Sequence, residues 1–268
     1  MGLAFYFKNV YNGDRPAHRN TNQGGWQSTE RSFIIMKKIG IIGAMDVEVE
    51  RLKADMTVTR QITKAQMHFC EGTLKNQPVV VVRSGIGKVN AAVCTQILVD
   101  EFGVDAVINT GIAGSLNAQI DIGDIVISTD VLHHDMDAVN FGYAPGQIPQ
   151  MEVFSFAADE PMAELAEKVC HRVNPEIKVF RGRVVSGDQF ISDRATKDRI
   201  TAQFHGFCTE MEGAAIAQAA YLNQIPFIVI RAISDKADDS ASEDYPTFEK
   251  KAVEHSVRLV EGFLAAQA

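Results

Sequence analysis

The stretch Ile39-Gly40-Ile41-Ile42-Gly43-Ala44-Met45-Asp46-Val47-Glu48 decides the fold class of this chain. Its first five residues form a short, continuous apolar run of the kind that makes a buried strand. From residue 46 to residue 55 the apolar residues Val49 and Leu52 recur at helical spacing, and Asp46 is placed to cap that helix. A buried strand that leads directly into a helix is the repeating unit of an α/β domain.

The rest of the chain continues this alternation. Further strands are expected over residues 66–74, 77–83, 105–109, 124–129, 178–185 and 226–231. Further helices are expected over residues 88–102, 160–173, 193–203, 211–223 and 245–266. A long loop, rich in polar and aromatic residues, is expected over residues 138–152. The pattern predicts one α/β domain with a central, mostly parallel sheet and helices outside it.

Composition excludes several classes of protein. The 268 residues are 46% hydrophobic and 22% charged, as in ordinary globular proteins, and the net charge of −8 argues against a nucleic-acid partner. No apolar run is long enough to cross a membrane, so no membrane partner is expected. The four cysteines form no C-x-x-C pair, which indicates reduced thiols in a cytoplasmic protein.

Residues 1–35 differ from the remainder. They are rich in Asn, Gln, Gly, Arg and Ser, and they lack helical periodicity and the apolar core of a signal peptide. We expect a disordered extension, a tag or an overlong start, with Met36 as a sensible true beginning. Residues 36–268 are expected to hold the whole functional domain.

Polar and small residues follow five of the expected strands, at residues 44–48, 84–88, 110–114, 186–191 and 232–235. Ligands of α/β sheets gather at the carboxyl ends of strands, so these segments predict one binding crevice. The glycines at residues 85 and 87 lack the third glycine of a dinucleotide fingerprint, and no P-loop is present. They indicate close approach of backbone to a ligand, or simply tight turns.

Three carboxylates in or near these segments could carry chemistry. Glu48 lies in a first helical turn, where the helix dipole favours the ionised form, so it suits either a general base or an inert first-turn acid. Asp235 follows an apolar strand, where burial raises a carboxyl pKa and keeps a proton available, although it could also cap a turn. Glu212 could accept hydrogen bonds from a sugar diol or merely begin a helix.

No metal or other cofactor is expected. The sequence His133-His134-Asp135 has adjacent histidines, which point to opposite faces of a strand, and no zinc-binding spacing accompanies them. No serine or cysteine triad motif is present either.

Taken in order, eight stretches resemble the 5′-methylthioadenosine/S-adenosylhomocysteine nucleosidases, which are members of the nucleoside phosphorylase superfamily. They comprise residues 39–45 with Glu48, 84–89, 109–114, 123–126, 141–149, 186–191, 210–212 and 229–235. The resemblance implies a single α/β domain whose mixed, twisted and partly barrel-like sheet is flanked by helices. It also implies a nucleosidase that hydrolyses the N-glycosidic bond of methylthioadenosine and S-adenosylhomocysteine, and also of 5′-deoxyadenosine, and releases adenine for methionine salvage.

The resemblance assigns the chemistry to particular side chains. Asp235 is expected to protonate adenine N7, with Ser234 placing it, and Glu48 to activate the attacking water. Glu212 is expected to hold the ribose hydroxyls, with Met211 as part of the ribose contact. Such a reaction builds positive charge on the sugar and negative charge on the departing base, which these groups would offset.

The same resemblance predicts the remaining contacts. Phe190 would stack on adenine, the backbone of Ile191 would bind its edge, and Tyr245 would close over the ligand. Phe141 and Pro149 would line the 5′ pocket of a neighbouring subunit, which implies a homodimer. Other expected binding residues are Met45, Ala113 and Gly114.

The chain departs from the family pattern at two places. Ile112 replaces a small polar residue, and Asp46-Val47 stand where some relatives have glutamates. Three different functions also remain open on these residues. A phosphorylase on the same fold would need a phosphate site, for which Arg83 and Lys88 are candidates. A nucleosidase for a futalosine-type nucleoside is the second possibility. A nucleoside-binding sensor is the third, and it would be expected to lack an acid or base carboxylate.

Overall fold

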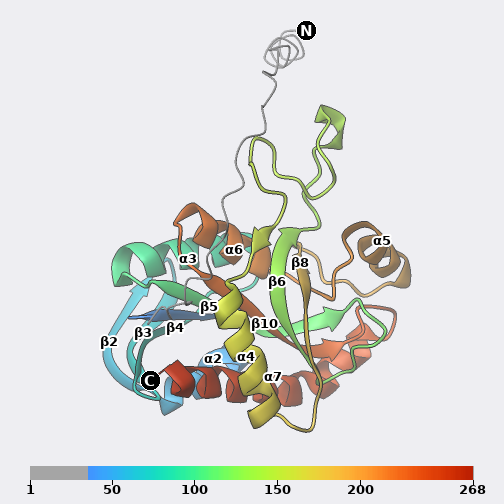
Figure 1. Cartoon of the computed structure of the whole chain (residues 1–268). Coiled ribbons are helices and arrows are strands. Elements are labelled where there is room, and N and C mark those ends of the chain that lie inside the picture. Colours follow the sequence, from blue (N-terminus) through green and yellow to red (C-terminus); the bar gives the residue numbers. More distant parts are fainter. Residues whose placement is uncertain (1–35, 268) are drawn as a thin grey trace, which may run out of the picture. The chain divides into compact units, whose positions relative to one another are not determined.

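The computed structural model describes residues 36–267, so the expectation for residues 1–35 lies outside the described part of the chain. Five strands close on one another as a small barrel (Figure 1). In the order of their pairing these are β10 (Phe227–Asp235), β6 (Ile125–His133), β8 (Val179–Ser186), β9 (Cys208–Glu210) and β5 (Ala106–Ser115), which pairs again with β10. The barrel-like sheet expected from the family resemblance is confirmed.

Four further strands extend the sheet from β5. They are β1 (Ile39–Gly43), β4 (Gln77–Arg83), β3 (Met67–Leu74) and β2 (Thr57–Lys64), in that order, while the short β7 (Phe156–Ala157) pairs with β6. The expectation of a mostly parallel sheet is wrong, because five of the ten strand pairings in the described chain are antiparallel. Strand β2 was not predicted, since it is largely exposed and its sequence carries little apolar alternation.

Helices surround this sheet. They are α2 (Asp46–Asp55), α3 (Lys88–Phe102), α4 (Glu160–Val173), α5 (Arg194–Phe204), α6 (Gly213–Leu222) and α7 (Ala241–Gln267). Residue 46 begins α2 and does not cap it, because Met45 takes the N-cap position. Within residues 36–267 there is no helix that is both long and apolar enough to cross a membrane.

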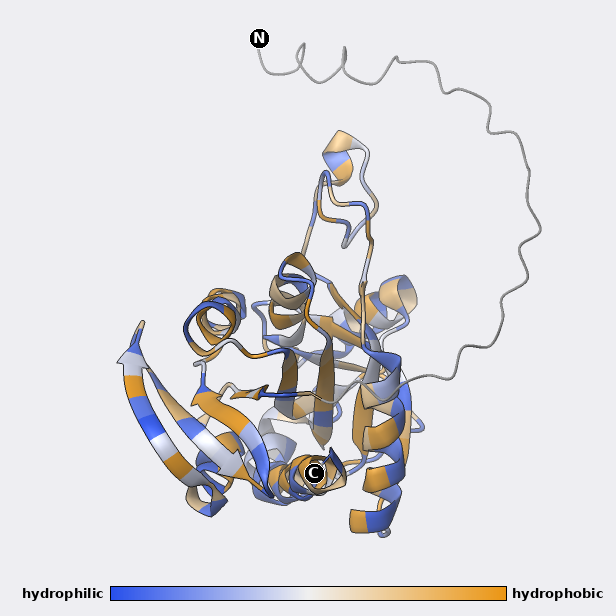
Figure 2. Cartoon of the chain, turned by 60° about the vertical axis from the view of Figure 1, so that its left-hand side comes forward, coloured by the Kyte–Doolittle hydropathy of each residue, from blue (hydrophilic) through white to orange (hydrophobic). Residues whose placement is uncertain are grey.

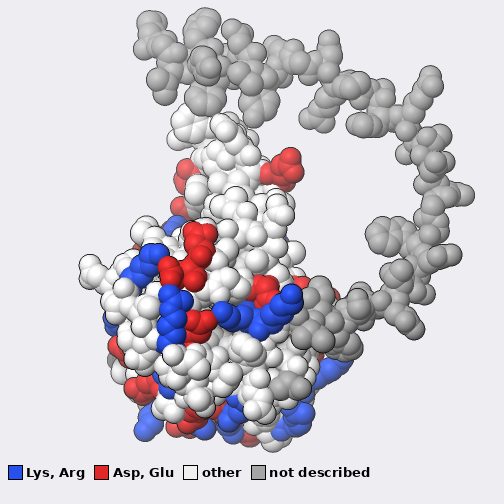
Figure 3. Space-filling view, turned by 90° about the vertical axis from the view of Figure 1, so that its left-hand side faces the viewer, with Lys and Arg blue, Asp and Glu red and all other residues white. Residues whose placement is uncertain are grey.

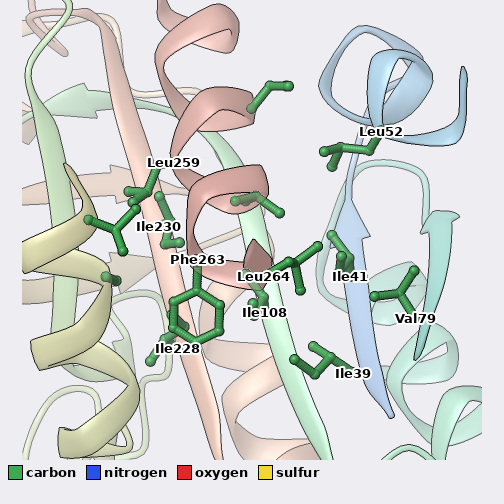
Figure 4. Packing of buried hydrophobic residues seen from close by; sticks show 14 of the residues in the cluster. Ile39, Ile41, Leu52, Val79, Ile108, Ile228, Ile230, Leu259, Phe263 and Leu264 are labelled. Carbon is green, nitrogen blue, oxygen red and sulfur yellow. The ribbon is translucent and has the colours of Figure 1, made fainter. Parts of the chain in front are cut away.

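A large apolar cluster joins α7 to the sheet. Leu259 and Phe263 of α7 lie against Ile230 and Ile228 of β10, and the same cluster continues to Ile41 of β1 (Figure 4). These side chains are fully buried, and burying each one contributes about 1.5–3 kcal/mol before entropy is counted. In Figure 2 the strands inside the molecule are hydrophobic, whereas the helices show hydrophilic residues on their outer sides. The core therefore holds β1, β5 and β10 in fixed register beneath the expected crevice.

Strands β5 and β10 continue through segments that were expected to be loops. The stretch 110–115 remains paired with β10 up to Gly114, and β10 itself ends at Asp235. A glycine is needed at residue 114 because a Cβ there would meet Asp235 Oδ1 at 2.7 Å. Functional residues of both segments therefore lie on a rigid sheet.

The expected long loop projects away from the barrel between β6 and β7 (Figure 1). It contains a single short helix, η1 (Val139–Phe141), and the side chain of Phe141 is 73% exposed. We call residues 136–155 the arm. In Figure 3 the arm is largely uncharged, and its only charged residues are Asp137 and Glu152. An uncharged projection with an exposed aromatic ring is typical of a protein–protein contact.

Candidate active site

One cavity of about 540 Å³ opens where β1, β5, β9 and β10 end or pass. Its size suits a nucleoside-sized ligand. Eleven of the residues expected to act or bind line it. These are Met45, Glu48, Ala113, Gly114, Phe190, Ile191, Met211, Glu212, Ser234, Asp235 and Tyr245. Phe141 and Pro149 are not part of its lining within the described chain; both belong to the arm.

Glu48 is held by backbone alone at one wall of the cavity. Its side-chain atom Oε2 accepts hydrogen bonds from the N–H groups of Ala44 (2.7 Å) and Met45 (3.0 Å), and Oε1 accepts from Ile112 N–H (3.2 Å). The residue is only 2% exposed, and this burial raises the pKa of Glu48, while Arg231 and the three N–H groups oppose the rise. Residue 112, a departure from the family pattern, thus bonds Glu48 through its backbone.

Arg231 is the fixed positive charge behind this wall. It is fully buried in the middle of β10 and pairs with the carboxylate of Glu210. The guanidinium of Arg231 and the carboxylate of Glu48 both lie against Gly111. A Cβ at residue 111 would lie within 3.0 Å of both side chains. The glycine is required here for close approach of two charged groups.

Two further carboxylates, those of Glu210 and Glu212, lie just before the start of α6. Glu210 accepts hydrogen bonds from Ser186 Oγ and from Gly213 N–H, at the positive end of the helix. Glu212 Oε1 accepts from Gly87 N–H at 2.8 Å, so the glycine loop after β4 positions this carboxylate. Burial, and then the charge of Glu210, raise the pKa of Glu212 to about 7.

Asp235 is the last residue of β10 and also lines the cavity. Oδ2 accepts from Ser234 Oγ (2.8 Å) and Oδ1 from Ala237 N–H (2.8 Å), which fixes the carboxyl plane. Burial is the main cause that raises the pKa of Asp235, and the charges of Asp244 and Asp238 add to it. A carboxyl group in this state retains a proton to higher pH than an exposed aspartate.

Two aromatic rings stand at the mouth of the cavity. Phe190 and Tyr245 meet edge to face with ring centroids 5.9 Å apart, and Tyr245 Oη reaches Met45 Sδ at 3.3 Å. Phe190 is about half exposed and lines the cavity. Helix α7 begins at residue 241, four residues before the expected start, and this earlier turn carries Ser242 into the lining.

Three residues of the site could not be found from the sequence: Arg231, Glu210 and Gly111. Arg231 interrupts an otherwise apolar buried strand, and a charge in such a strand is a signal for a buried pair. The partner could not be identified from sequence, because Glu210 reaches Arg231 only through the pairing of β8 with β9 and of β9 with β5. The need for glycine at residue 111 likewise depends on two side chains from distant segments.

The other polar candidates have structural partners. Lys88 Nζ bonds both carboxylate oxygens of Asp135 (2.6 and 2.8 Å), and Arg83 pairs with exposed Asp46 at 3.1 Å. His133 bonds Gln218 at 3.0 Å. Among residues 36–267 no group of three or more His, Cys, Asp or Glu side chains is arranged to hold a metal ion. The four cysteines are free and buried.

Comparison with known proteins identifies the class to which this fold and site belong. The family model of the phosphorylase superfamily matches residues 38–265, which is nearly all of the described chain. The chain therefore belongs to the phosphorylase superfamily.

Within that superfamily the similarity is to nucleosidases. A 5′-methylthioadenosine/S-adenosylhomocysteine nucleosidase of Staphylococcus aureus is 43% identical over 228 residues, which cover 85% of this chain and 99% of that protein. The nucleosidase of the same name from Neisseria meningitidis, solved with methylthio-immucillin-A, is 38% identical with a TM-score of 0.83, and the match covers 86% of this chain and all of the other. A futalosine hydrolase of Helicobacter pylori is 30% identical with a TM-score of 0.81, covering 86% and 98%.

Proposed function

We propose that this protein is a 5′-methylthioadenosine/S-adenosylhomocysteine nucleosidase, which hydrolyses the bond between adenine and the 5′-substituted ribose. The observation that carries the proposal is the arrangement of two buried carboxyl groups, Glu48 and Asp235, on one cavity of nucleoside size. The identity to nucleosidases over nearly their whole length supports it.

Asp235 is the proposed acid. Cleavage of the glycosidic bond leaves negative charge on the purine, and a proton delivered to N7 neutralises that charge. The raised pKa of Asp235 keeps its carboxyl protonated at a pH where an exposed aspartate is ionised. Hydrogen bonds from Ser234 and Ala237 hold it in one orientation, so the proton is presented in a fixed direction.

Glu48 is the proposed base, and Glu212 the proposed ligand of the ribose hydroxyls. A base whose pKa is raised toward neutrality is well matched to taking a proton from water, and Arg231 beside it preserves the ionised form. The negative charges of Glu48 and Glu212 also stabilise the positive sugar that forms as the bond breaks. No step in this mechanism requires a metal ion or an organic cofactor.

Phosphorolysis fits this cavity poorly. An attacking phosphate needs cationic ligands, yet Lys88 and Arg83 are paired with Asp135 and Asp46, and neither lines the cavity in the described chain. Buried Arg231 is bonded to Glu210 and lies 3.9 Å from Glu212. Glu48 and Glu212, in their ionised forms, would repel a phosphate dianion.

The arm supports a homodimer. Its exposed Phe141 and largely uncharged surface suit burial against a second copy, in which Phe141 and Pro149 would complete the pocket for the 5′ substituent. Ile86, which lines the cavity of one chain, is 54% exposed and so could be covered by a second copy. Mixing inactive Asp235→Asn chains with Phe141→Ala chains tests the arrangement, because only a shared site can restore activity in the mixed dimer.

The proposal is tested by substrate preference. Purified protein is given methylthioadenosine, S-adenosylhomocysteine, 5′-deoxyadenosine and a futalosine-type nucleoside, and release of the free base is followed. We expect rapid adenine release from the first two and little turnover of the futalosine-type nucleoside. A kcat/KM that is highest for the futalosine-type nucleoside would instead assign the chain to the activity named for the Helicobacter pylori relative.

A further inference from the structure

Thr209 is a buried residue of the cavity wall to which neither the mechanism nor the family resemblance gives a role. It is the middle residue of β9, it is 5% exposed, and it belongs to the lining of the cavity. Its hydroxyl oxygen has no hydrogen-bond partner among the described residues. Buried hydroxyl groups in proteins are nearly always bonded, so an unbonded one beside a cavity indicates a partner that arrives with the ligand.

The strand pairings relate Thr209 to the proposed acid through one intervening residue. Thr209 is the partner of Gly114 in the β9–β5 pair, and Gly114 is the partner of Asp235 in the β5–β10 pair. The three residues form one row across three strands, with at most about 10 Å between the outer Cα atoms. Thr209 and Gly114 form a regular pair and therefore face the same side of the sheet, and Gly114 has no side chain to fill the space there. The pairing of Gly114 with Asp235 follows a β-bulge in β10, so the side on which Asp235 lies must come from contacts rather than from the register.

Neighbouring residues of β9 confirm the direction in which Thr209 points. Cys208 packs into an apolar cluster on one side, and Glu210 bonds Ser186 and Arg231 on that same side of the strand. Because side chains alternate along a strand, Thr209 points to the other side. A Cβ at Gly114 would meet Asp235 Oδ1 at 2.7 Å and Ala237 Cβ at 2.8 Å, so the side toward which this row faces is the side of the acid.

The surroundings of Thr209 are otherwise apolar. Its partner in β8 is Val185, which packs in a small cluster with Ile191 and Ala237. Ile191 also lines the cavity. A polar group in apolar surroundings is a determinant of ligand orientation, as is usual for the few polar groups in small-molecule sites.

We infer that the Thr209 hydroxyl binds the purine base of the nucleoside, as a specificity-determining group that acts together with Asp235. The inference rests on the proposed function, because Asp235 is the group that approaches the base in that mechanism. A hydroxyl both donates and accepts, so it can bond a ring nitrogen or an exocyclic amino group. Phe190 would bind the face of the base, whereas Thr209 would bind its edge.

The test measures binding of free adenine by calorimetry to the full-length protein and to three variants. Thr209→Val keeps the shape and removes the hydroxyl, and we expect adenine affinity to fall about three- to tenfold. Thr209→Ser retains the hydroxyl and is expected to bind within about twofold of the unsubstituted protein. Thr110→Val is the matched control, because Thr110 Oγ1 is also buried without a partner in the described chain but lies outside the lining.

Kinetics with methylthioadenosine give a second readout. If the Thr209 hydroxyl contacts the base equally in the ground state and the transition state, Thr209→Val raises KM and leaves kcat nearly unchanged. Equal adenine affinity in the unsubstituted protein and in folded Thr209→Val would overturn the inference and leave the nucleosidase proposal intact. An unsubstituted protein that neither binds adenine nor releases it from methylthioadenosine would overturn the proposed function, and the role of Thr209 with it.

Discussion

Replacement of Gly111 by alanine tests whether the close approach of Glu48 and Arg231 matters for activity. A Cβ at residue 111 would lie 3.0 Å from Glu48 Cδ and closer still to the nearest oxygen and to Arg231 Nη1, whereas ordinary contacts begin at 3.4 Å. The carboxylate or the guanidinium must therefore move by several tenths of an ångström to about 1 Å. A misplacement of this size can cost about 10²-fold in rate, so we expect kcat to fall by about two orders of magnitude.

The assay must separate this effect from loss of stability. Overpacking in a core destabilises by about 1–3 kcal/mol, so unfolding is measured alongside adenine release. Gly40→Ala is the matched control, because its Cβ would meet Leu98 Cδ1 at 2.9 Å in the core and would touch no residue of the cavity lining. It should lose some stability and retain its kcat. A folded Gly111→Ala enzyme with unchanged kcat would refute the requirement that Glu48 and Arg231 be held at this distance.

The charges of the site lead to three further predictions. Glu48→Gln and Asp235→Asn should each lower kcat by about 10²–10⁴-fold in an adenine-release assay, and a loss below tenfold in either would contradict its assigned role. Activity should decline at low pH as Glu48 takes up a proton. Because burial raises the pKa of Glu48, this decline should begin above the ordinary glutamate value of 4.5. A pH–rate profile that stays flat down to pH 4.5 would argue against Glu48 as the base. The pKa of Glu212 is about 7 in the folded protein, against 4.5 for an unperturbed glutamate. Between these two pH values the folded state therefore binds more protons than the unfolded state. The free energy of unfolding should consequently fall as pH rises from about 4.5 to 7. Denaturant titrations should show that Glu212→Gln flattens this slope, and an unaltered slope would show that the carboxyl titrates normally.

The fold class could be predicted because buried strands and amphipathic helices alternate along the chain with little ambiguity. The closure of the barrel could not be derived from that pattern, since it depends on β10 pairing with both β5 and β6. Local periodicity carries no information on such long-range pairings. The resemblance to nucleosidases supplied this part of the prediction.

Some site residues could likewise be predicted from the sequence, and others could not. Asp235 and Glu48 could be predicted because they lie within five residues of the carboxyl ends of apolar strands, where α/β sheets bind their ligands. Arg231 and Glu210 could not be paired from sequence, and neither could the unbonded hydroxyl of Thr209 be recognised. Each of these depends on which groups of distant strands lie within bonding distance, and that is a property of the register alone.

The measurement that tests the central claim most directly is the effect of phosphate on the sugar product. Methylthioadenosine is incubated with the protein in phosphate-free buffer and again with added phosphate, and adenine and the sugar are quantified. We predict equal rates of adenine release and free methylthioribose in both cases, because the proposed nucleophile is water activated by Glu48. Release that requires phosphate and yields the sugar 1-phosphate would contradict this prediction.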